Sequence, residues 1–193
     1  MEQKTEDSEN AQNSILTTIG CLFFIGIVVV FILLSSYHPK LTPAEIQQAK
    51  AEKKAAFVKF DNQLFSATSS CDIKFGEAQM LLSKDAIKAS SAFDEAHYAC
   101  LDSFNNVQKI EIPDLIGYDQ QNLLKKAIED ITTAYASKQS AASHAYKFLA
   151  KGDVGAITEA NSEIQLAQET LAKGKSKIKE VKIEVGILSK DKK

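Results

Sequence analysis

Apolar residues between positions 43 and 186 recur at steps of three and four, the spacing that gathers side chains on one face of an α-helix. Four such stripes follow one another along the chain. They predict four amphipathic helices whose apolar faces meet in a common core. In chain order the stripes are Phe57, Phe60, Leu64, Ala67, Cys71, Phe75, Ala78 and Leu82; Ala89, Ala92, Ala96, Cys100, Phe104 and Val107; Leu123, Ala127, Ile131, Ala134, Ala141, Ala145 and Phe148; and Ile157, Ala160, Ile164, Ala167, Leu171, Ile178, Val181 and Val185.

Capping and turn residues mark where these helices begin. Thr42 is followed by Pro and, three positions on, by Glu, which is the spacing of a capping box. Asp85 and Asp153 each follow a short polar or glycine-containing turn and have N-cap chemistry. The segment 110–117, IEIPDLIG, contains a proline and a glycine and is predicted to connect the second helix to a third that starts at about Asp119.

The predicted fold class is all-α: an antiparallel four-helix bundle made of two long helical hairpins, preceded by a single transmembrane helix. The segments around Asp85 and Asp153 share a few residues. Duplication and the common requirements of a helix-turn-helix explain that likeness equally well.

The transmembrane prediction rests on residues 15–34, ILTTIGCLFFIGIVVVFILL, an uncharged run long enough to cross a bilayer core of ~30 Å at ~1.5 Å per residue. The run has no cationic region before it and no small-residue cleavage site after it, so a retained anchor is favoured over a signal peptide. Most of the run follows Cys21, which is the wrong order for a lipoprotein cysteine. The predicted organisation is an acidic tail at 1–14, a transmembrane helix at 15–35, a juxtamembrane segment at 36–42, the bundle at 43–186 and a basic tail at 187–193.

Cys71 and Cys100 lie almost symmetrically about the turn at Asp85. Folding the hairpin there brings both cysteines to the same height, where a structural disulfide is geometrically possible. The alternative is two small buried thiols. Because disulfides persist in oxidising compartments, the pair favours a periplasmic bundle anchored in the inner membrane. The lysines that follow the run favour the opposite, cytoplasmic side, since positive charge is retained inside; they are Lys40, Lys50, Lys53 and Lys54.

Composition excludes several functions. All 23 basic residues are lysine, so the bidentate guanidinium forks of sequence-specific DNA recognition are missing. Trp is absent, which removes the usual platform for stacking sugars and disfavours carbohydrate binding. His97 and Cys100 form half of a possible zinc site, but neither His38 nor His144 supplies convincing further ligands. We therefore predict no metal, no cofactor and no nucleic-acid partner. The adjacent acidic residues are expected to be solvated helix faces rather than catalytic pairs; they are Asp94 with Glu95 and Glu129 with Asp130.

No sequence motif of a known catalytic site is present, so the chain is not expected to be an enzyme. The leading expectation is a membrane-anchored helical interaction or scaffold protein of the bacterial envelope, with an unknown protein partner or self-association. Two alternatives are an extracytoplasmic sensor of a small ligand that acts through a partner, and an immunity-type or lysis-type envelope protein.

Overall fold

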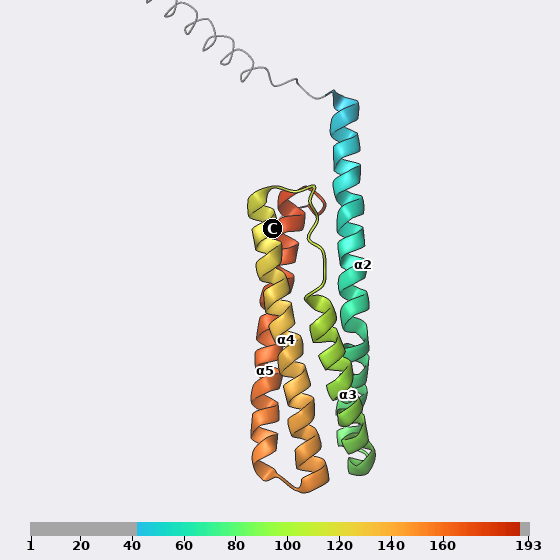
Figure 1. The fold of residues 1–193 in the computed structure, drawn as a ribbon, viewed down its shortest axis with the longest axis vertical. Coiled ribbons are helices and arrows are strands. Elements are labelled where there is room, and N and C mark those ends of the chain that lie inside the picture. The colour runs from blue at the N-terminus through green and yellow to red at the C-terminus, as the bar shows by residue number, and fades with distance from the viewer. Residues whose placement is uncertain (1–41, 190–193) are drawn as a thin grey trace, which may run out of the picture. The chain divides into compact units, whose positions relative to one another are not determined.

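A computed structural model describes residues 42–189, which form four helices and no strand in that range. The helices are α2 (Pro43–Leu82), α3 (Ala86–Val107), α4 (Tyr118–Lys151) and α5 (Val154–Glu184). They alternate in direction along the bundle (Figure 1). The expected all-helical bundle is therefore confirmed. The chain divides into two compact units at Ile46, and the bundle described below belongs to the second unit, which begins at Gln47.

The predicted acidic tail at 1–14 and transmembrane helix at 15–35 lie outside the described residues. So do positions 36–41 of the juxtamembrane segment and 190–193 of the basic tail. Among residues 42–189, no helix combines the length and the apolar character that crossing a membrane requires.

Side chains cap three of the four helices. The Thr42 hydroxyl accepts a hydrogen bond from the Glu45 backbone N–H at 3.3 Å, and the Glu45 carboxylate accepts one from the Thr42 N–H at 2.7 Å. The Asp85 carboxylate accepts a bond from the Lys88 backbone N–H at 3.0 Å, which lowers the pKa of Asp85. The Asp153 carboxylate accepts bonds from two backbone N–H groups in the first turn of α5. These contacts satisfy donors that a helix start otherwise leaves without partners.

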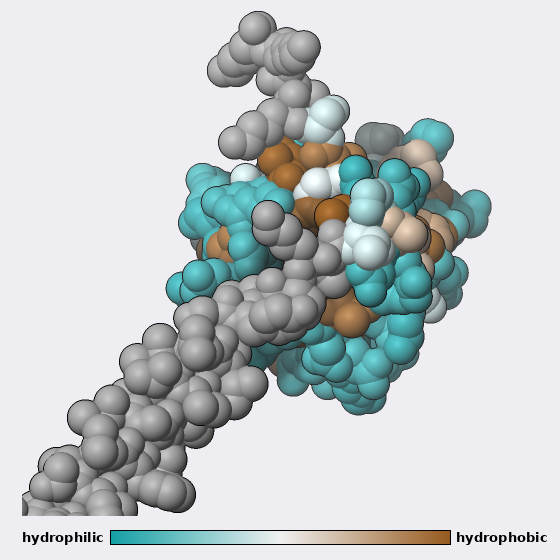
Figure 2. All heavy atoms as spheres, turned by 90° about the horizontal axis from the view of Figure 1, so that it is seen from above, coloured by the Kyte–Doolittle hydropathy of each residue, from teal (hydrophilic) through white to brown (hydrophobic). Residues whose placement is uncertain are grey.

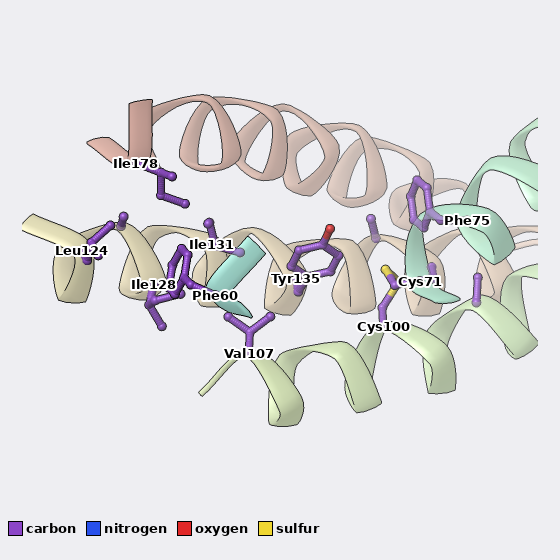
Figure 3. Packing of buried hydrophobic residues seen from close by; sticks show 14 of the residues in the cluster. Phe60, Cys71, Phe75, Cys100, Val107, Leu124, Ile128, Ile131, Tyr135 and Ile178 are labelled. Atoms are coloured by element: carbon purple, nitrogen blue, oxygen red, sulfur yellow. A yellow bond between two sulfur atoms is a disulfide. The ribbon is translucent and has the colours of Figure 1, made fainter. Parts of the chain in front are cut away.

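α4 lies against the other helices, and its buried side chains form the middle of the core. Figure 3 shows Leu124, Ile128, Ile131 and Tyr135 following one another along α4, between side chains of the other three helices. Leu124 and Tyr135 are almost fully buried although neither belongs to the predicted stripe. Leu82 was expected in the core but is 42% exposed, because α2 ends there and no neighbouring element covers the turn.

Cys71 of α2 and Cys100 of α3 form the predicted disulfide (Figure 3). Their Cα atoms are 4.4 Å apart, and both side chains are fully buried. In the chain-entropy description, closing a loop with a sequence separation of 29 stabilises the fold by about 3 to 4 kcal/mol. The alternative of two separate buried thiols is thus wrong for this structure.

α3 is 22 residues long and pairs with only part of α2, which has 40. The segment 108–117 continues from the end of α3 without helical structure and leads to the start of α4 (Figure 1). Its apolar side chains Ile110, Ile112 and Ile116 pack on the core cluster. The segment thereby closes the part of the bundle that a longer α3 would cover, and we call it the linker.

Candidate interaction surface

Ion pairs fix how α2 is turned about its own axis. Asp61 accepts hydrogen bonds from Lys182 of α5 at 2.6 and 2.7 Å. About three helical turns further along α2, Asp72 pairs with Lys138 of α4 and accepts a hydrogen bond from the buried Tyr135 hydroxyl at 3.0 Å. Both lysine side chains are only 17% exposed, so these contacts are better shielded from water than a surface pair. They hold one face of α2 toward the bundle and the other toward solvent.

Two members of the adjacent acidic pairs noted in the sequence, Glu95 and Asp130, also form ion pairs between helices. Asp130 of α4 pairs with Lys177 of α5, and the Asp130 side chain is 23% exposed. Glu95 of α3 pairs with Lys74 of α2 at 3.0 Å, which raises the pKa of Lys74. The expectation that these acidic residues only face water is therefore wrong for Asp130, which ties α4 to α5.

The outward face of α2 carries four large apolar side chains, which we call the α2 ridge: Val58, Phe65, Ile73 and Met80. Their exposed fractions are 51%, 73%, 59% and 63%. They follow one another at steps of seven, eight and seven residues, so at ~100° per residue they fall within one narrow arc of the helix. This arc lies roughly 150° from the centre of the buried stripe of α2. The ridge is thus a second apolar face, pointing away from the core.

Small or uncharged residues separate the ridge positions. They are Ala55, Asn62, Ser69 and Gly76, each one turn from a ridge side chain. Together the eight positions form an uncharged seam from residue 55 to residue 80, spaced by steps of three and four. A regular seam of this kind is the pattern by which helices pack against one another.

Two grooves lie on either side of the linker. The first, of about 690 Å³, has α2 and the end of α3 as its walls, and includes Ala55, Val58 and Asn62 of the seam. The second, of about 760 Å³, lies between α2, the linker and the start of α4. The seam is therefore continuous with a hollow where the linker replaces α3. Figure 2 shows hydrophobic residues in the middle of this end of the bundle, surrounded by hydrophilic ones.

A third hollow runs between α2 and α5. Two smaller cavities of about 280 and 240 Å³ share Asp72 and Leu171 in their walls. The polar groups at their junction are bonded to one another, since Asp72 holds both Lys138 and the Tyr135 hydroxyl. Burial raises the pKa of Tyr135, which keeps that hydroxyl protonated as a donor.

The residues considered for a metal site have other partners. Cys100 is bonded to Cys71, and the His97 ring contacts the backbone carbonyl of Gln139 at 3.2 Å. His144 Nδ1 of α4 lies 2.7 Å from the Glu159 carboxylate of α5. Among residues 42–189, no three His, Cys, Asp or Glu side chains are grouped closely enough to hold a metal ion.

Comparison with protein-family models, with curated proteins and with solved structures gives no match for this chain. The class of molecule that the geometry defines is a disulfide-tied four-helix bundle with one helix exposing a second apolar face.

Proposed function

We propose that this chain is a single-pass, membrane-anchored helical interaction protein of the bacterial envelope, whose bundle binds another protein through the α2 ridge. The ridge is the observation that carries the proposal. Single exposed apolar residues are normal on protein surfaces, but a contiguous apolar face is typical of a site that another protein covers.

The rigidity of α2 supports a role in binding. The disulfide at Cys71 holds α2 on the side away from the ridge, and the ion pairs at Asp61 and Asp72 hold the flank of α2 beside the ridge. A surface presented by a fixed helix loses little conformational entropy when a partner covers it. The carboxylates of Asp61 and Asp72 are engaged by lysines, a structural use that favours a binding role over a catalytic one.

The anchor and the compartment rest on separate observations. The apolar run at 15–34 supports a membrane-spanning segment. The Cys71–Cys100 disulfide supports an oxidising compartment, hence a periplasmic bundle. The lysines after the run favour the cytoplasmic side, and we give the disulfide more weight because it stabilises the fold directly.

A photo-crosslinking amino acid placed in the full chain tests the binding role in native membranes. At Ser69, within the seam, we expect covalent protein adducts after illumination. At Ser91, an exposed residue of α3, we expect few. Equal labelling at the two positions, or none at either, would contradict binding through the ridge.

Fractionation tests the anchor and the side of the membrane. The chain is expected to remain in the pellet after alkaline carbonate extraction. A membrane-impermeant thiol reagent is expected to label Cys71 and Cys100 in intact spheroplasts only after reduction and unfolding. Extraction into the soluble fraction would overturn the anchor, and cysteines found reduced in intact cells would overturn the periplasmic placement.

The hollow between α2 and α5 favours a second candidate function, the sensing of a small ligand. Its two cavities of about 280 and 240 Å³ are slightly below the usual range for ligand sites, ~300 to 1,000 Å³. A solute that displaces Lys138 from Asp72 would gain a charged partner there. Co-purification of a solute that is lost in the Asp72→Asn variant would support this second function.

A further inference from the structure

We propose that the protein that covers the α2 ridge is a second copy of this chain, with the two α2 helices packed in parallel and in register. This inference names the partner of the interaction surface proposed above and rests on that proposal. It follows from four properties: the spacing of the seam, the identity of its polar member, the area that it offers, and the chain that precedes it.

The spacing of the seam fits a pair of supercoiled helices. Its positions run 55, 58, 62, 65, 69, 73, 76 and 80, alternating steps of three and four except for two consecutive steps of four around Ser69. This alternation keeps one face of a helix against a neighbour. The second step of four at Ser69 corresponds to a four-residue insertion in the heptad pattern, which unwinds the supercoil locally without moving the seam to another face. At ~1.5 Å per residue the seam is ~38 Å long.

Asn62 favours a second copy over an unrelated apolar helix. In a parallel, in-register pair each seam residue meets its own counterpart, so Asn62 meets Asn62 of the other copy. The two amides then donate to and accept from each other, and neither is left without a partner. An apolar helix laid on the same seam would bury the Asn62 amide without a hydrogen bond, at a cost in free energy.

The size of the side chains allows close approach. Gly76 has no atom within 4 Å of the place where a Cβ would stand, so the helix surface is open there. Ser69 and Ala55 are also small. These positions alternate with the ridge side chains Phe65 and Met80, so in the in-register pair the two helices approach closely where small residues meet, and the large residues between them meet their own counterparts.

The area is sufficient for a dimer of moderate strength. The exposed parts of the four ridge side chains amount to about 450 Å² per copy, taking ~150 to 200 Å² for a fully exposed large apolar side chain. Two copies would bury ~900 Å² through these residues alone. The small seam residues and the stems of neighbouring lysines bring the total toward the ~1,200 Å² at the lower end of stable interfaces.

The chain that precedes α2 favours the parallel arrangement. The apolar run at 15–34 ends nine positions before Pro43, a gap of at most ~32 Å when fully extended. If that run is anchored as proposed, two copies in one membrane present the same end of α2 to the bilayer. Confinement to a membrane also raises the effective concentration of the second copy, which compensates for a modest area.

The first part of α2 within the bundle unit agrees with this arrangement. Between Gln47 and Ala56 no side chain is buried, although the segment is helical throughout. A helix of this length is marginal in water without packing. Pairing with the same segment of a second copy, through Ala51 and Ala55, would give it a neighbour.

Disulfide trapping tests both the pairing and its direction in the full chain, with Cys21 replaced by Ser so that it forms no crosslink. Ala55→Cys lies on the seam near one end, and Lys53→Cys lies two residues away on the opposite face as its control. We expect a covalent dimer under mild oxidation from Ala55→Cys and at least ~10-fold less from Lys53→Cys, because neighbouring cysteines must meet within a few ångströms. In a mixture of the Ala55→Cys and Met80→Cys variants, a crosslink that forms only between the two different variants would show an antiparallel pair. That result would overturn the parallel register.

A charge on the seam tests the interface without trapping. Phe65→Lys changes a ridge residue that is 73% exposed, so the bundle itself is expected to fold; Tyr98→Lys changes an exposed aromatic of α3 as the matched control. Light scattering of the full chain in a mild detergent is expected to give the mass of two protein chains for the parent and for Tyr98→Lys. Phe65→Lys is expected to raise the Kd at least ~100-fold, since two buried phenylalanines are replaced by two like charges.

The outcomes separate this inference from the broader function. Seam crosslinks that contain two copies of the chain support both. Seam crosslinks that contain only a different protein leave the interaction role standing and overturn self-association. A parent chain that stays monomeric in membranes and forms no seam crosslink overturns both.

Discussion

Gly174 provides the most direct test of the packing between α4 and α5. Gly174 is a buried residue in the middle of α5. A Cβ atom at this position would stand 2.7 Å from Ile131 Cγ1 and 2.9 Å from the Ala127 carbonyl oxygen of α4. Both distances are shorter than ordinary Cβ contacts, and one of the two atoms belongs to the backbone. Gly174→Ala therefore requires α4 and α5 to move apart.

The expected magnitude follows from a comparison with Gly76, a helical glycine with nothing within 4 Å of its Cβ position. Replacing glycine by alanine inside a helix stabilises it by about 1 kcal/mol, and this gain is common to both substitutions. Only Gly174→Ala adds the cost of overpacking, about 1 to 3 kcal/mol. We expect Gly76→Ala to be more stable than Gly174→Ala by that difference.

The assay is urea unfolding of the full chain in mild detergent, followed by circular dichroism at 222 nm. Measurement at two protein concentrations separates any contribution of self-association, since Gly76 lies on the seam. Equal free energies of unfolding for the two variants would refute the close approach of α4 and α5 at Gly174.

Three further predictions concern stability. Replacing Cys71 and Cys100 together by Ala is expected to lower the free energy of unfolding by about 3 to 4 kcal/mol in the same assay, because the closed loop of the unfolded chain is released. Tyr135→Phe is expected to make stability less sensitive to alkaline pH. Burial raises the pKa of Tyr135, so the parent loses stability above the unfolded pKa of about 10, by up to ~1.4 kcal/mol per pH unit, and the variant lacks this loss; unfolding curves at pH 8 and pH 11 measure the difference. Asp153→Ala is expected to cost about 1 kcal/mol, since two N–H groups of α5 lose their cap, whereas the control Glu180→Ala, at an exposed position of α5, is expected to change stability little.

Each of these three has a clear contrary result. A cysteine-free variant as stable as the parent would show that the crosslink adds nothing to this fold. An equal alkaline loss in Tyr135→Phe would assign the pH dependence to other groups. Unchanged stability in Asp153→Ala would mean that the first turn of α5 does not unfold cooperatively with the rest of the bundle.

The helix boundaries could be predicted because local chemistry determines them. Thr42, Asp85 and Asp153 each stand at a helix start, where a short oxygen-bearing side chain meets free backbone N–H groups. The disulfide between Cys71 and Cys100 could be predicted for a related reason, because a hairpin turn midway between two cysteines places them at one height.

The surface could not be predicted in the same way. The dominant stripe of α2 contains Phe57 and Phe60, and Phe65 does not belong to it. That the second apolar face stays uncovered depends on contacts with distant helices, such as that between Asp61 and Lys182, 121 positions apart. The side chain of Tyr135 was missed because it lies one position from the expected stripe, and α4 is buried over a wider arc than a surface helix.

The disulfide also determines how the bundle would respond to a mechanical load. If a membrane tether pulls on the start of α2, α2 unravels from that end until the load reaches Cys71. The crosslink then passes the load directly to Cys100, so the chain between the two cysteines cannot lengthen. The disulfide thereby prevents an extension of ~100 Å, which is the fully extended length of a segment with a sequence separation of 29. Under tension, the α2–α3 hairpin would behave as a single stiff piece.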